Sequence, residues 1–219
     1  QTASRARETS MFSLQTIFGK GDKFYGLLEA GAQAARESTR ALSELIAAPA
    51  GQRSLERFRL AHQTVKDISA KLSEELVNTF VTALDREDIE ALNSALYKIT
   101  KVVEKFAERF ELAAGRIGDV DFTARAAMLE RACEVIEQMV KLLHKGMNLE
   151  QTKALNDRIQ AIEAEADRLI LELYRDSYLN ETDAMRYLVR KDLFELLEKA
   201  IDRVRDAGNV VYHIVLKNS

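Results

Sequence analysis

Two pairs of acidic residues near the C-terminus have the type and spacing needed to hold a cation. Glu163 and Asp167 lie four residues apart, and so do Glu198 and Asp202. Residues four apart lie about one turn apart on the same face of a helix, so each pair presents two carboxylates side by side. Two such helices packed together would gather four oxygen ligands of the kind that suits hard cations or iron-type ions. The pattern predicts a metal site; the alternative is a solvated acidic face, since 31% of the residues are charged.

Long helices must position these carboxylates. The 219 residues include one proline, Pro49, nine glycines and no tryptophan, and the helix-favouring residue types Ala, Leu, Glu, Lys and Arg dominate. No stretch alternates apolar and polar residues over the length of a strand. The sequence therefore predicts an all-α protein. Six helices are expected, over residues 22–47, 54–78, 85 to between 115 and 118, 121–146, 149–178 and 181–217.

The last two predicted helices each carry an apolar stripe at helical spacing. One stripe contains Leu155, Ile159, Ile162, Ala166, Leu169 and Leu173, and the other contains Leu193, Leu197, Ala200, Val204, Ala207 and Val211. Such stripes are typical of helices that face a bundle core. A rotation of about 100° per residue places Glu198 and Asp202 away from the second stripe, so a metal there is expected at the surface or in a groove.

Neighbouring polar residues do not extend the predicted ligand set. Asp206 lies one turn beyond Asp202 and could add a fifth ligand. The favoured interpretation is a solvated acid paired with Arg203 or Arg205, and Glu195 is interpreted as solvated in the same way. The three histidines do not cluster in the sequence, and none is assigned as a ligand.

The two halves of the chain align as copies of a three-helix unit. At offsets of 100 and 101 residues, the aligned positions are Gln63, Asp67, Tyr97 and Lys101 in the first copy and Glu163, Asp167, Glu198 and Asp202 in the second. Only Asp67 of the first set is acidic, and Lys101 would place a cation where a metal ion is expected, which Coulomb repulsion disfavours. The acidic pairs are therefore complete in the second copy alone, and we predict that the first copy has lost its site.

Three segments carry a resemblance to a known family: FSLQTIFGKGDKFYGLLEAGA (12–32), NTFVTALDREDIEAL (78–92) and KDLFELLEKAIDRVRDAGNVV (191–211). They resemble the opening, the TF-x-TP-x-DREDI-x-x-L signature and the final-helix signature of PhoU-like proteins. The closest branch is the one encoded beside low-affinity Pit phosphate transporters. Ala83 stands where the family usually has proline. The resemblance runs from about Met11 to the C-terminus.

The resemblance implies a PhoU-like six-helix fold made of two repeated three-helix bundles. A single domain over residues 11–219 would contain repeat one (about 20–118) and repeat two (about 121–219). Met11 is interpreted as the natural start, with residues 1–10 as a cloning remnant or an upstream extension. In this family E/D-x-x-x-D motifs bind metal. The implied ligands of a divalent or trivalent ion of the Fe, Zn, Mn or Ni type are Glu163, Asp167, Glu198 and Asp202.

The function implied by the resemblance is a non-enzymatic accessory or regulatory role in inorganic phosphate transport. The protein would dock on a Pit-type transporter at the cytoplasmic membrane face, and homodimerisation is expected from the frequency of such assemblies. A metal-dependent helical-bundle enzyme and a metal-free helical interaction scaffold are the alternatives. The enzyme is disfavoured because no histidine has the Glu-x-x-His spacing of di-iron bundles, and no Ser-His-Asp order, phosphate loop or H-E-x-x-H motif is present.

The amino-acid composition limits which binding partners and which cellular compartment we expect. A net charge of −3 argues against nucleic acid as the main partner. The single cysteine, Cys133, excludes an internal disulfide and suits a reducing cytoplasm, and its apolar neighbours predict a packed thiol. No run of about twenty apolar residues is present. We therefore expect a soluble cytoplasmic protein with peripheral association at the inner membrane face.

Overall fold

The computed structural model describes the backbone of residues 2–49 and 51–219, and the side chains of residues 23–49 and 51–219. Within that backbone there are six helices and no strand: α1 (Thr2–Ala47), α2 (Glu56–Asn78), α3 (Arg86–Leu112), α4 (Thr123–His144), α5 (Leu149–Asn180) and α6 (Ala184–Lys217). The predicted all-α class is confirmed. The first helix was expected to begin near residue 22, whereas α1 begins at Thr2. Met11, which we interpreted as the natural start, lies among the residues whose side chains the structure does not describe.

Capping residues explain where several helices begin and end. Asn148 accepts a hydrogen bond from the backbone N–H of Gln151 at 2.8 Å and so caps α5, while Asp183 caps α6. Gly146 follows α4 with a φ of 115°, a left-handed conformation that glycine adopts without strain. Asp85 lies at the N-cap position of α3 as predicted. Its side chain makes no capping bond and pairs with Lys217 instead.

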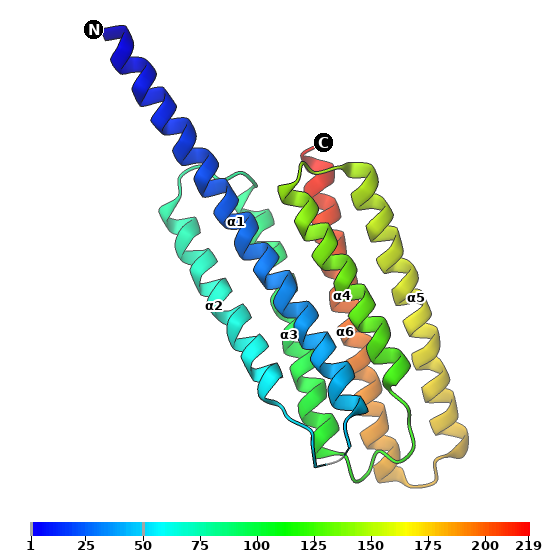
Figure 1. The fold of residues 1–219 in the computed structure, drawn as a ribbon. Helices are drawn as coiled ribbons and strands as arrows, with labels where there is room; N and C mark the ends of the chain where they lie inside the picture. The colour runs from blue at the N-terminus through cyan, green and yellow to red at the C-terminus, as the bar shows by residue number, and fades with distance from the viewer. Residues whose placement is uncertain (1, 50) are drawn as a thin grey trace.

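The helices run up and down in sequence, so that each is antiparallel to its neighbour along the chain (Figure 1). α1, α3, α4 and α6 form the middle of the molecule, where α1 packs on α4 and α3 packs on α6. Within the described residues, α2 contacts only α1 and α3, and α5 contacts only α4 and α6. The two three-helix units therefore join through their inner helices, while α2 and α5 are flanking helices.

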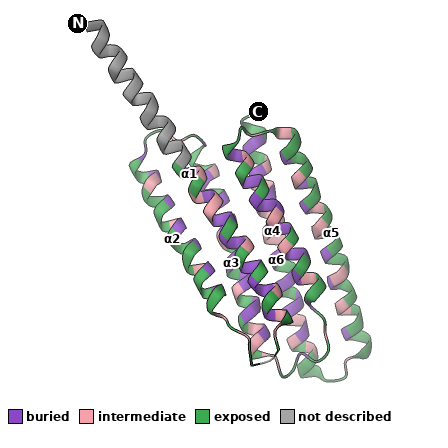
Figure 2. Cartoon of the chain, viewed as in Figure 1, coloured by how far each residue is buried: buried purple, intermediate pink, exposed green. Residues whose placement is uncertain are grey.

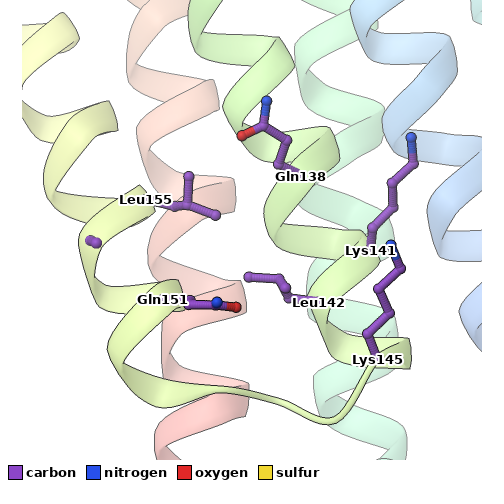
Figure 3. Close-up of a pocket in the computed structure, with 7 residues that line it drawn as sticks. Gln138, Lys141, Leu142, Lys145, Gln151 and Leu155 are labelled. Carbon is purple, nitrogen blue, oxygen red and sulfur yellow. The ribbon is translucent and has the colours of Figure 1, made fainter.

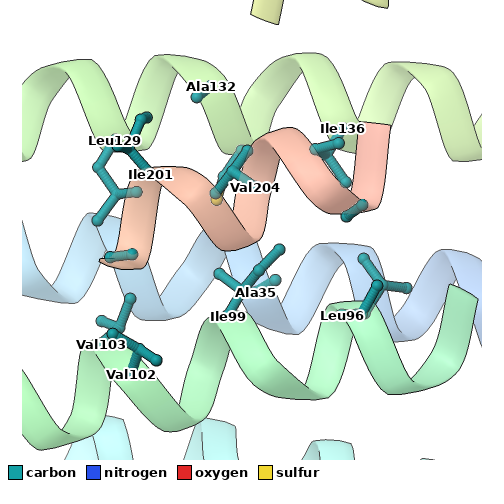
Figure 4. Packing of buried hydrophobic residues seen from close by; sticks show 14 of the residues in the cluster. Ala35, Leu96, Ile99, Val102, Val103, Leu129, Ala132, Ile136, Ile201 and Val204 are labelled. Carbon is teal, nitrogen blue, oxygen red and sulfur yellow. The ribbon is translucent and has the colours of Figure 1, made fainter. Parts of the chain in front are cut away.

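One hydrophobic core contains side chains from all six helices, and buried positions line the inner faces (Figure 2). In Figure 4, Ile201 and Val204 of α6 lie between α1, α3 and α4. Each fully buried Ile, Leu or Phe side chain contributes about 1.5–3 kcal/mol of stability. Cys133 of α4 is buried in this core, and burial raises the pKa of its thiol to about 12. The predicted packed thiol is confirmed.

The two predicted apolar stripes differ in burial. Every residue of the α6 stripe is buried, because α6 is surrounded by three other helices. On α5 only Ile159 and Ala166 of the stripe are buried, since this flanking helix has two neighbours. Gly208 lets α5 and α6 approach closely: a Cβ there would lie 2.9 Å from the Cδ1 atom of Ile159. This close approach sets how α5 and α6 face each other.

A buried ion pair closes the end of the second unit. Arg190 of α6 binds Glu181 at 3.0 Å, and both side chains are 6% exposed. The same guanidinium group donates to the carbonyl of Ile117 and to Asp119, so it ties α6 to the α3–α4 connection. Gly118, with a φ of 75°, gives it room, since a Cβ there would lie 2.6 Å from Nη2 of Arg190. No motif in the sequence had singled out Arg190.

Candidate functional site

The structure brings the four predicted carboxylates together on the facing surfaces of α5 and α6. Glu163 and Asp202 are joined through one guanidinium group, and Asp167 lies near enough to both for their charges to affect it. Glu198 is likewise influenced by Asp167 and Asp202. The positions are partly exposed, with the Glu163 side chain 14% and the Asp202 side chain 39% accessible. The four side chains are thus exposed or partly exposed, and they lie outside the buried apolar stripe of α6.

Two of the four carboxylates, Asp167 and Glu198, have raised pKa values. Burial raises the pKa of Asp167, and repulsion by Glu163 and Asp202 raises it further. Burial also raises the pKa of Glu198, with added repulsion from Asp167, Asp202 and Glu195. A group that becomes harder to ionise in this way marks a place where additional positive charge would be stabilised.

Arg205 supplies positive charge within the site, and its role there was missed in the sequence. Its Nη1 atom pairs with Glu163 across the helix boundary and lies 2.9 Å from Oδ1 of Asp202. Its Nη2 atom lies 3.4 Å from Oδ1 of Asp206. Burial lowers the pKa of Arg205, but the hydrogen bond to Glu163 and the nearby carboxylates outweigh it, and the net shift is upward. The i, i+3 spacing to Asp202 was the available signal.

The predicted pairing of Asp206 is confirmed. Arg203 donates to Oδ2 of Asp206 at 2.9 Å, in addition to the contact with Arg205. Asp206 is therefore neutralised by two arginines, and nothing in its contacts points to a ligand role.

The donor chemistry of the site fits a hard cation, but its side chains are arranged around an arginine. Four carboxylates from two helices supply oxygen ligands of the right type. Among the described side chains, however, no group of three or more His, Cys, Asp or Glu residues has the geometry of a metal site. Because Arg205 joins Glu163 to Asp202, these two carboxylates face a guanidinium group. Metal binding by these residues stays a prediction.

The corresponding face of α2 and α3 has different chemistry. Gln63 donates to Asp67 at 2.8 Å, so this pair forms a hydrogen bond in place of a carboxylate pair. His62 lies 3.2 Å from the hydroxyl of Tyr97 and pairs with Glu104 through its other ring nitrogen. On this face the amide of Gln63, the imidazole of His62 and the phenol of Tyr97 already contact other side chains of the protein.

A separate hollow of about 440 Å³ lies between α4 and α5 and contains none of the four carboxylates. Its lining residues are Gln138, Lys141, Leu142, Lys145, Gln151, Ala154 and Leu155. Figure 3 shows Leu142 of α4 and Gln151 of α5 directed toward each other across the gap. Lys141 is already bound to Glu137, at 2.5 Å. The hollow is an open surface feature and shares no residue with the candidate site.

Comparison with solved structures identifies the fold. Two structures from Shewanella oneidensis MR-1 share the fold: a PhoU-like protein (TM-score 0.76, 13% identity, covering 88% of this chain and 96% of that one) and a proposed PhoU-like phosphate regulatory protein (TM-score 0.75, 13% identity, covering 89% and 99%). The chain therefore has the PhoU-like fold, as the sequence resemblance implied.

Sequence comparison finds two similar proteins. The chain is 22% identical over 206 residues to a proposed pit accessory protein of Rhizobium meliloti (strain 1021), covering 92% of this chain and 96% of that protein. It is 23% identical over 145 residues to UPF0111 protein YkaA of Bacillus subtilis (strain 168), covering 66% and 70%. No family model matches the chain. The resemblance to PhoU-like, Pit-associated proteins is confirmed.

Proposed function

We propose that this protein is a non-enzymatic accessory protein that regulates inorganic phosphate transport by docking on a Pit-type transporter at the cytoplasmic membrane face. The similarity to the Rhizobium meliloti protein carries the proposal, because it extends over nearly the whole of both chains. The shared fold with a proposed phosphate regulatory protein supports the same process. The accessory and regulatory names of these relatives support a role without catalysis.

An exposed apolar tip offers a surface for docking. We define it as residues 77–81, which span the end of α2 and the start of its connection to α3 and overlap the segment that matches the family signature. Phe80 is fully exposed, and Val77 and Val81 are 83% and 62% exposed. Within the part of the chain that the structure describes, no helix is long and apolar enough to cross a membrane. A fully exposed aromatic side chain is the type of residue that anchors protein interfaces.

The docking proposal is tested by substitution of the tip. Phe80→Ser should reduce co-purification with a co-expressed Pit-type transporter by at least about tenfold, the size of effect expected for an interface anchor. Leu171→Ser is the matched control, since Leu171 is 67% exposed on α5 and lies outside the tip. Loss of binding in the control alone would place the interface on α5. Absence of any complex with the wild-type protein, together with unchanged phosphate uptake, would refute the proposed function.

We further propose that Glu163, Asp167, Glu198 and Asp202 bind a divalent or trivalent ion of the Fe, Zn, Mn or Ni type. Support comes from their convergence on facing helices and from the raised pKa values of Asp167 and Glu198. A bound cation would relieve the repulsion and tie α5 to α6 through shared oxygen ligands. Because α6 also packs against α3 and α4, the state of this site is connected to the inner helices of both units.

A further inference from the structure

Arg205 crosses from α6 to α5 beside the carboxylate cluster. It pairs with Glu163 on α5 and, from the same Nη1 atom, contacts Asp202 at 2.9 Å on its own helix. The guanidinium group is half-buried, with 30% of the Arg205 side chain accessible. Arginine is suited to this position because its delocalised charge and several N–H donors can serve two carboxylates at once.

The repeat shows that this position forms a helix-to-helix link in both units. At the same offset that aligns Tyr97 with Glu198, residue 104 aligns with residue 205. Glu104 of α3 pairs with His62 of α2, as Arg205 of α6 pairs with Glu163 of α5. The sign of the charge is opposite in the two copies, but each side chain reaches the flanking helix of its own unit.

We propose that Arg205 is the internal counter-cation of the carboxylate site, and that it competes with a metal ion for Glu163 and Asp202. This inference rests on the proposed metal binding and specifies how that site is regulated. A metal ion and a guanidinium group cannot both occupy the space beside the same oxygens, because two cations at such short range repel strongly. Metal binding therefore requires that Arg205 move away.

Asp206 provides a place for the displaced guanidinium group. Its Oδ1 atom already lies 3.4 Å from Nη2 of Arg205, so a small rotation of the side chain would strengthen that contact. The site thus has two arrangements, one closed on arginine and one open to metal. Competition of this kind raises the metal concentration needed for binding, because only the open arrangement takes the ion.

The test is the affinity of the protein for Mn²⁺, measured by electron paramagnetic resonance of free Mn²⁺ or by calorimetry. Arg205→Met keeps an unbranched apolar stem but lacks the guanidinium group, and it should tighten Mn²⁺ binding by about tenfold, since it removes a cation beside two ligands. Arg203→Met is the matched control: Arg203 lies on the same helix and binds Asp206 at 2.9 Å. Its affinity should change much less than that of Arg205→Met, because the ion pair of Arg203 is with Asp206 and not with a proposed metal ligand.

Arg205→Lys guards against a folding defect in the methionine variant, and circular dichroism checks both. Lysine keeps the charge but loses the fork of donors, so its affinity should lie between those of the wild type and Arg205→Met. Unchanged or weaker Mn²⁺ binding in folded Arg205→Met would overturn the competition while leaving the metal site intact. Equal tightening in Arg203→Met would also overturn it, as a general charge effect. Absence of binding in every variant would overturn both the competition and the proposed metal site.

Discussion

The α2–α3 face and the α5–α6 face are built on the same helical framework but have opposite chemistry. On the first, His62, Tyr97 and Glu104 form a network, and Lys101 stands where the second has Asp202. On the second, Arg205 pairs with Glu163 and Asp202, and Asp167 lies near enough for their charges to affect it. Helix pairing in both units rests on buried apolar side chains. The charged face of each pair was therefore free to diverge, and one copy can lose its acidic pairs without loss of the fold.

The largest expected effect is a loss of stability when a buried charge of the second copy is removed. Arg190 aligns with Ile89, which is fully buried in the first copy. Arg190→Met should lower the free energy of unfolding by about 3 kcal/mol, because it leaves Glu181 buried without its partner. Urea denaturation would measure the loss.

Two further variants sharpen this comparison. Arg186→Met should cost under about 1 kcal/mol, since Arg186 is 45% exposed and 3.8 Å from Glu181. Arg190→Met combined with Glu181→Gln should recover part of the stability, because no buried charge is then left unpaired. A loss of less than about 1 kcal/mol in Arg190→Met itself would show that the ion pair contributes little to the second unit.

The next effect is stabilisation by metal, which we expect from the second copy alone. At about 100 times its dissociation constant, a bound ion adds about 2.7 kcal/mol to the free energy of unfolding. Glu198→Gln with Asp202→Asn should abolish this gain, whereas Asp67→Asn in the first copy should leave it unchanged. Thermal melts with and without Mn²⁺, Fe²⁺, Zn²⁺ and Ni²⁺ measure both. An equal loss from Asp67→Asn, or no shift with any ion, would contradict the assignment.

The smallest expected effect is a pH dependence of the metal-free protein. The pKa values of Asp167 and Glu198 are raised by burial and by neighbouring carboxylates. A carboxylate with a higher pKa in the folded state binds more protons there, so its contribution to stability falls as pH rises above the ordinary value of about 4. Asp167→Asn with Glu198→Gln should remove this fall and add about 0.5 kcal/mol at pH 7, a small gain because both groups are largely exposed to solvent.

Denaturation at several pH values in the presence of a chelator measures this difference. The quantity to compare is the change in stability between the variant and the wild-type protein. Other groups titrate in the same range, and Glu137, whose pKa is lowered by Lys141 and Arg36 against the effect of burial, has the opposite dependence. Parallel curves for the two proteins would show that the carboxylates of the second copy do not repel one another appreciably.

The helices and their repeat could be predicted from the sequence because both depend on local patterns. Pro49 and Gly146 mark helix ends by their own backbone preferences, and α2 ends at Asn78 and α6 at Lys217, as expected. The site was partly predictable as well. Four-residue spacing places Glu198 and Asp202 on one face, and the aligned motifs on consecutive helices place Glu163 and Asp167 opposite them.

The partner choices of individual side chains could not be predicted in this way. Asp85 has the sequence signature of an N-cap, yet it pairs with Lys217, which lies far away in the chain. Arg205 was expected at most to neutralise Asp206, and it also bridges Glu163 and Asp202. Lys217 and Glu163 are brought near by other helices, so no local pattern reports these two pairs; only the i, i+3 spacing of Arg205 to Asp202 was visible in the sequence.

The sequence by itself thus determined the six helices, their apolar stripes and the presence of complete acidic pairs in the second copy alone. These features follow from residue propensities and helical periodicity, which act within one helix. Only the tertiary structure decided that Arg205 lies among the acids, because that depends on the rotation and axial shift of α6 against α5. The core sets this relation through contacts such as that of Gly208 with Ile159, where a single added Cβ would lie 2.9 Å from the facing side chain.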